Sequence, residues 1–101
     1  MTDQVGLARA IEVLREHRQY LTDKGVIHAS VVGSVASGTD DLASDLDVLI
    51  DAKVGHGLTI FDLVDIGDRL SHAYGRHVDI IPSGALRARH QSLRDGAIRA
   101  F

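Results

Sequence analysis

Two aspartates, Asp45 and Asp47, are separated by one residue in a run that is otherwise apolar up to Ile50. If this run is a β-strand, its period of two puts Leu46, Val48 and Ile50 on one face and both carboxylates on the other. Adjacent carboxylates repel each other and are costly to desolvate, and a bound cation relieves both costs. The pair is therefore predicted to bind metal.

A turn of small residues precedes this pair. It begins with Gly33-Ser34 and ends at Gly38, and residues 34–38 are predicted to form a short helical turn whose first amides point at the Gly33-Ser34 corner. Such a corner is typical of a phosphate site, because free amides and the helix dipole favour an anion. Gly33 could also serve a tight turn with positive φ, and Ser34 could be an N-cap; neither role excludes phosphate binding.

A third acid, Asp79, lies in a later predicted strand with Val78 and Ile80 on the opposite face. Adjacent strands lie about 4.8 Å apart, so three such carboxylates could bracket two ions about 3.5 to 4 Å apart. Oxygen ligands select Mg²⁺ or Mn²⁺ over zinc. The plainer alternatives are that Asp45 and Asp47 are solvated acids of an edge strand, and that Asp79 pairs with Arg76.

The elements that must position these residues follow from periodicity and capping signals. We expect helices at 4–22, from Thr59 to Tyr74, and from Ser83 or Gly84 through Ile98, with strands at 26–32, 45–51 and 77–81. This order, α-β-turn-β-α-β-α, predicts an α/β (α+β) fold, a small mixed sheet with flanking helices.

The whole chain narrows the function further. Its 101 residues predict one domain over 1–101, and a net charge of −3 argues against a dedicated nucleic-acid binder. Zero cysteines exclude disulfides and thiolate metal sites, and the absence of a signal-like or membrane-spanning stretch predicts a cytoplasmic protein. The six histidines show no metal-ligand spacing, and His77 is interpreted as a surface residue beside a turn. A partner protein, a small nucleotide or a second copy is the expected ligand.

Gly33-Ser34, the turn ending in Gly38, the run Ser44-Asp45-Leu46-Asp47 and the later Val78-Asp79 together resemble the minimal nucleotidyltransferases of the DNA polymerase beta superfamily. The closest likeness is to the prokaryotic antitoxins of this type, which pair with HEPN toxins. The resemblance covers nearly the full length of the chain.

The resemblance implies a role for each of these residues. Gly33 and Ser34 would hold the triphosphate of ATP, Asp45 and Asp47 would bind two Mg²⁺ ions, and Asp79 would complete the second metal site and help deprotonate the acceptor. The reaction would move AMP from ATP onto a hydroxyl, a tyrosine of the HEPN toxin.

One departure favours an alternative function. The family often places a large polar or basic residue just before the second glycine of the turn, where this chain has Ser37, which cannot neutralise phosphate charge. Either Arg76 or Lys53 takes that role, or nucleotide affinity is lower. The alternative is therefore a catalytically weak binding module that neutralises its partner by docking.

Overall fold

The computed structural model describes residues 2–38, 45–53, 58–85 and 95–101. Its helices are α1 (Thr2–Glu16), α2 (Arg18–Asp23), α3 (Gly33–Ser37) and α4 (Ile60–Tyr74), followed by the 3₁₀ turn η1 (Ser83–Ala85). Its strands are β1 (Val26–Val32), β2 (Leu46–Ala52), β3 (Val78–Pro82) and β4 (Ile98–Arg99). The predicted mixed α/β architecture is confirmed.

The four strands form one mixed sheet in the order β3-β2-β1-β4. Strand β2 is parallel to β3, which follows it through α4, and antiparallel to β1, which in turn is antiparallel to β4. The N-terminal ends of β2 and β3 therefore lie at the same end of the sheet as the C-terminal end of β1. All three predicted site segments meet at that end.

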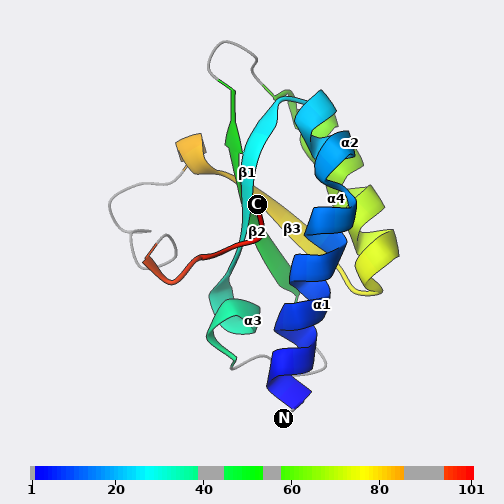
Figure 1. Ribbon diagram of the computed structural model, residues 1–101. Helices are drawn as coiled ribbons and strands as arrows, with labels where there is room; N and C mark the ends of the chain where they lie inside the picture. The colour runs from blue at the N-terminus through cyan, green and yellow to red at the C-terminus, as the bar shows by residue number, and fades with distance from the viewer. Residues whose placement is uncertain (1, 39–44, 54–57, 86–94) are drawn as a thin grey trace.

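Helices α1, α2 and α4 cover one face of the sheet (Figure 1). The residues that β2 turns toward them, Leu46, Val48 and Ile50, are at most 1% exposed, as the alternation in the sequence predicts. They pack in one cluster with helix residues such as Leu14 and Leu70. The intervening residues of β2, Asp47 among them, lie on the other face, which we call the second face.

Two predicted helices differ from the observed ones. The predicted helix at 4–22 is divided at His17, whose backbone angles (φ −100°, ψ 12°) lie outside the helical range, so α1 and α2 are separate helices. The last predicted helix is wrong at its end, because Ala97 is outside any helix and Ile98 belongs to β4. Residues 86–94 of that prediction lie outside the described residues.

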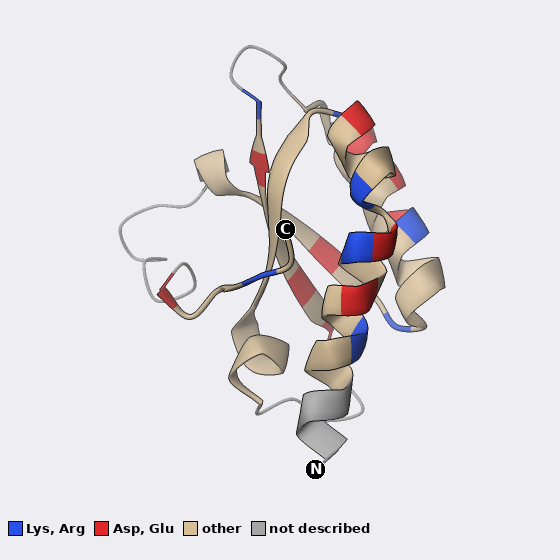
Figure 2. Cartoon of the chain, in the orientation of Figure 1, with Lys and Arg blue, Asp and Glu red and all other residues tan. Residues whose placement is uncertain are grey.

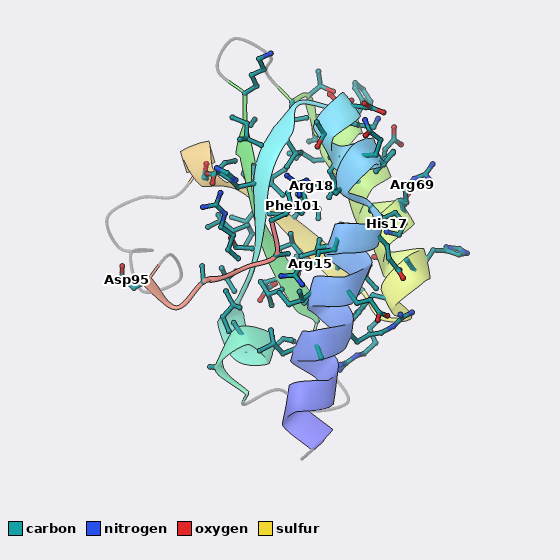
Figure 3. All side chains as sticks on the ribbon, viewed as in Figure 1. Arg15, His17, Arg18, Arg69, Asp95 and Phe101 are labelled. Carbon is teal, nitrogen blue, oxygen red and sulfur yellow. The ribbon has the colours of Figure 1, made fainter. Side chains whose placement is uncertain are left out.

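Strand β4 forms because the C-terminal residues bind the edge of β1. The amide of Ala100 donates to the carbonyl of Ala29 at 2.8 Å, and Arg15 Nε donates to the carbonyl of Ala100 at 2.9 Å. Phe101 packs against the core with the guanidinium of Arg18 5.4 Å from its ring centre (Figure 3). These contacts depend on residues distant in sequence, so periodicity does not reveal them.

The helix that connects β2 to β3 begins and ends where the sequence predicts. Thr59 caps α4 in a reciprocal capping box with Asp62, and Gly75 ends it with φ of +91°. Among the described residues, no helix is long and apolar enough to cross a membrane.

Candidate active site

The turn after β1 brings its backbone against Asp47. Gly33, the first residue of α3, has φ of +76°, and a Cβ built on it would lie 2.7 Å from Oδ2 of Asp47. Both facts require glycine, because other residues rarely adopt this φ and the carboxylate already occupies the space. The predicted phosphate turn therefore lies directly beside a predicted metal ligand.

Ser34 and Ser37 lie within the short helix α3. Ser34 is partly exposed, and its carbonyl accepts a hydrogen bond of 3.2 Å from the Ser37 hydroxyl. Gly38 ends the helix with φ of +77°. The predicted helical turn is thus observed, with Ser37 bonded back onto its own turn.

Four side chains capable of binding metal form two rows across β2 and β3. The parallel register pairs Asp47 with Asp79, and a hydrogen bond of 3.0 Å from the Leu46 amide to the His77 carbonyl continues the pairing. Asp45 therefore lies opposite His77, and these two residues form the row next to the pair Asp47 and Asp79. We call Asp45, Asp47, His77 and Asp79 the ligand array. Figure 2 shows acidic residues as red bands on the neighbouring strands β2 and β3, which carry Asp47 and Asp79.

The carboxylates of Asp45 and Asp79 repel the negative charge of Asp47. The pKa of Asp47 is raised above its usual 3.8, first by partial burial and then by the charges of Asp79 and Asp45, while His77 acts in the opposite direction. Nε2 of His77 lies 2.7 Å from Oδ1 of Asp79, and that hydrogen bond, followed by the carboxylate's charge, raises the pKa of His77 above 6.5. The array favours a positive charge in its midst.

The array fits a divalent cation. Ligand atoms of Asp45, His77 and Asp79 all lie within 4.8 Å of one another, and Asp47 turns its Oδ2 to the Gly33 turn beside them. Carboxylate oxygens are the ligands that Mg²⁺ and Mn²⁺ prefer. Asp45 and His77 are exposed, so an ion reaches them from solvent.

His77 is the one member of the array that sequence reasoning missed. A histidine next to a turn is usually a surface residue, and no second histidine is spaced to share a metal with it. The signal was nevertheless present, because residues i and i+2 of a strand share a face and His77 precedes Asp79 by two.

The remaining predicted residues lie elsewhere. Lys53 follows the far end of β2, where its amide bonds to the Gly25 carbonyl, so it cannot replace a basic residue at the Gly33 turn. The guanidinium of Arg76 lies 5.3 Å from the ring centre of Tyr74 and donates to its hydroxyl. Ser44, just before the array, lies outside the described residues.

Comparison with known proteins shows the family to which this chain belongs. The profile of the nucleotidyltransferase domain family matches residues 14–99. A curated relative, the "putative protein adenylyltransferase" of Methanocaldococcus jannaschii, is 31% identical over 84 residues, which are 83% of this chain and 85% of the relative. This chain belongs to the nucleotidyltransferase domain family, and the family prediction is confirmed.

Solved structures show the same fold. One of a "putative minimal nucleotidyltransferase" is 30% identical with a TM-score of 0.68, over 87% of this chain and 93% of that one. Another holds a tri-AMPylated Shewanella oneidensis HEPN toxin with its MNT antitoxin. It matches at a TM-score of 0.62 and 15% identity, over 98% of this chain and 71% of that one.

Proposed function

We propose that this nucleotidyltransferase is a cytoplasmic antitoxin that moves AMP from ATP onto a tyrosine hydroxyl of a HEPN toxin, with Mg²⁺ ions held by Asp45, Asp47 and Asp79. The observation that carries the proposal is the ligand array with Gly33 against it. Nucleotidyl transfer needs backbone that binds phosphate and carboxylates that bind cations. The Gly33 turn and Asp47, to which we assign these two roles, lie against each other.

The proposed reaction exchanges one bond to phosphorus for another. The acceptor oxygen attacks the α-phosphorus of ATP, the bond from that phosphorus to the bridging oxygen breaks, and pyrophosphate leaves. When bound, the cations supply charge neutralisation at the phosphates and a lower pKa for the acceptor hydroxyl. Asp79 accepts the acceptor's proton, while Gly33 and Ser34 hold the phosphates through amides and a hydroxyl.

The choice of a protein acceptor rests on the relatives. The Methanocaldococcus relative is named for protein adenylyl transfer, and the Shewanella complex contains a toxin that carries AMP groups beside an antitoxin of this fold. Both descriptions favour AMP over other nucleotides and a partner protein over a small molecule.

Label transfer tests the proposal. The protein, the product of the neighbouring gene, Mg²⁺ and ATP labelled at the α-phosphate are incubated together, with Asp47→Asn and Asp51→Asn as a matched pair. Asp51 lies on the same strand and face, about 13 Å from Asp47 along β2. We expect label on the partner with wild type and Asp51→Asn, and a loss of at least about 100-fold with Asp47→Asn. Transfer that survives Asp47→Asn would refute the metal role of this residue.

Docking without catalysis is the second candidate. The observation in its favour is Ser37, whose hydroxyl bonds to the Ser34 carbonyl and brings no positive charge to the turn. If docking alone neutralises the partner, the Asp47→Asn variant still neutralises it.

A further inference from the structure

We propose that His77 is itself a metal ligand, and that its ring nitrogen makes the array bind Mn²⁺ more tightly than Mg²⁺. The inference rests on the proposed metal-dependent transfer and adds to it the ligand set and the choice of cation. It concerns a residue to which the sequence pattern assigned only a surface position.

The backbone places His77 in the first row of the array. The hydrogen bond between the Leu46 amide and the His77 carbonyl fixes His77 opposite Asp45, just before the parallel pairing begins. A ring nitrogen of His77 and carboxylate oxygens of Asp45 and Asp79 lie within 4.8 Å of one another. A cation between them takes one ligand atom from each side chain, with no change of strand register.

The second row holds a different set of donors. Asp47 faces the Gly33 turn with Oδ2 and pairs in register with Asp79. Asp79 therefore belongs to both rows, beside Asp47 on one side and bonded to His77 on the other. A pair of cations sharing Asp79 would have an all-oxygen site near the phosphate turn and a site with one nitrogen farther from it.

The nitrogen changes which ion binds best. Carboxylates accept Mg²⁺ and Mn²⁺ alike, whereas imidazole is a ligand of transition metals, and Mg²⁺ selects oxygen. The side chain of His77 is 62% exposed and that of Asp79 is 50% exposed, so the ion can keep water ligands as both cations require. The site with His77 therefore binds Mn²⁺ more tightly, and Mg²⁺ still serves the all-oxygen site.

The competing explanation is that His77 only orients Asp79. The hydrogen bond of 2.7 Å to Oδ1 fits that role as well. The two explanations differ in whether a histidine nitrogen is bonded directly to the ion. Pulsed electron paramagnetic resonance of bound Mn²⁺ detects this bond through the magnetic coupling of the ¹⁴N nucleus.

The experiment uses the full chain, freed of metal, with Mn²⁺ alone and neither nucleotide nor partner. Wild type is prepared with natural and with ¹⁵N-labelled histidine, beside His77→Ala and the control His72→Ala, an exposed histidine on α4. We expect ¹⁴N coupling in wild type and in His72→Ala, its replacement by ¹⁵N coupling in the labelled protein, and its loss in His77→Ala. The Mn²⁺ dissociation constant of His77→Ala should rise about tenfold or more, and the Mg²⁺ constant far less.

The outcomes separate this inference from the proposed function. Mn²⁺ binding that requires Asp47 but shows no nitrogen coupling would overturn the role of His77 and leave metal-dependent transfer intact. Nitrogen coupling that persists in His77→Ala would also overturn the role of His77 and leave metal-dependent transfer intact. Mn²⁺ binding indifferent to both Asp47→Asn and His77→Ala would overturn the inference together with the metal dependence of the proposed function. The labelled wild type tests the direct bond without any substitution.

Discussion

At the scale of single residues, Gly33 combines two constraints, a positive φ and contact with Asp47. Gly33→Ala should therefore lower the free energy of unfolding by about 1 to 3 kcal/mol and weaken Mn²⁺ binding, because the new methyl group must displace the carboxylate. Chemical denaturation and metal titration measure the two effects.

Two other glycines provide matched controls for Gly33→Ala. Gly75 has φ of +91° with open space around it, so Gly75→Ala should cost about 1 kcal/mol of stability and leave metal binding unchanged. Gly84 has neither constraint, and Gly84→Ala should be neutral in both assays. Equal metal binding by the Gly33 and Gly75 variants would contradict the contact with Asp47.

The charge of Asp47 should cost the metal-free protein stability. Folding raises the pKa of Asp47 above 3.8, so ionised Asp47 destabilises the fold, an effect absent below pH 3.8 and complete above the raised pKa. At pH 7 in a chelator, Asp47→Asn should therefore melt at a higher temperature than wild type, although solvent screening limits the gain to about 1 kcal/mol. A lower melting temperature would show that the carboxylate is already compensated within the chain.

The array also shows what a sequence reveals about single residues. Asp45, Asp47 and Asp79 were predictable because apolar neighbours alternate with them, and alternation fixes the face in any strand. His77 follows the same rule within the predicted strand 77–81, but a histidine beside a turn usually lies at the surface, and it adds no acid to the pattern. The positive φ of Gly33 was predictable from the turn of small residues, whereas its contact with Asp47 depends on the sheet register.

At the scale of elements, the capping box of α4 makes the free energy of unfolding depend on pH in the acidic range. The pKa of Asp62 is lowered first by the hydrogen bond from the Thr59 amide and then by that from the Thr59 hydroxyl. A lowered pKa stabilises the fold above 3.8, and this contribution is lost as pH falls through the folded value. Wild type should thus lose stability relative to Asp62→Asn between pH 5 and pH 2.5, which thermal melts at each pH will show.

Thr59→Ala tests the same cap from its other side. Loss of the threonine oxygen leaves the Asp62 amide without its partner at 3.1 Å, so we expect a cost of about 1 kcal/mol at pH 7. The substitution also removes one hydrogen bond to the Asp62 carboxylate, so the acid-dependent loss should begin at higher pH than in wild type. An unchanged pH profile would mean that the Thr59 amide and Lys24, whose Nζ lies 3.6 Å from Oδ1 of Asp62, suffice to hold the carboxylate.

The elements divide into those that local sequence determines and those that tertiary contacts determine. Helix α4 was predictable because its N-cap, apolar stripe and terminal glycine are all local. Strand β4 has two residues and no alternation to read, and it exists because Arg15 and the edge of β1 bind Ala100. The break at His17 likewise interrupts a helical pattern that continues on both sides.

At the scale of the whole molecule, the two faces of the sheet differ in what they carry. Helices α1, α2 and α4 bury one face and supply the stability, while the ligand array lies on the second face at the end where three strands meet. A change of one atom in the array therefore leaves the packed side and its surfaces as they are. Asp47→Asn therefore tests the proposed catalytic role of the array without altering the packed face.

Coexpression with the proposed partner toxin tests whether catalysis and binding can be separated. Because Asp47→Asn replaces one oxygen and removes one charge, the variant should still copurify with the toxin, yet it should fail to restore growth, since no AMP is transferred. Asp51→Asn, on the same face but away from the array, should both copurify with the toxin and restore growth. Growth and the mass of the recovered toxin are measured together, one AMP group adding about 329 Da. If Asp47→Asn restores growth while the toxin keeps its unmodified mass, docking alone neutralises it, and the ligand array serves some purpose other than defence against this partner.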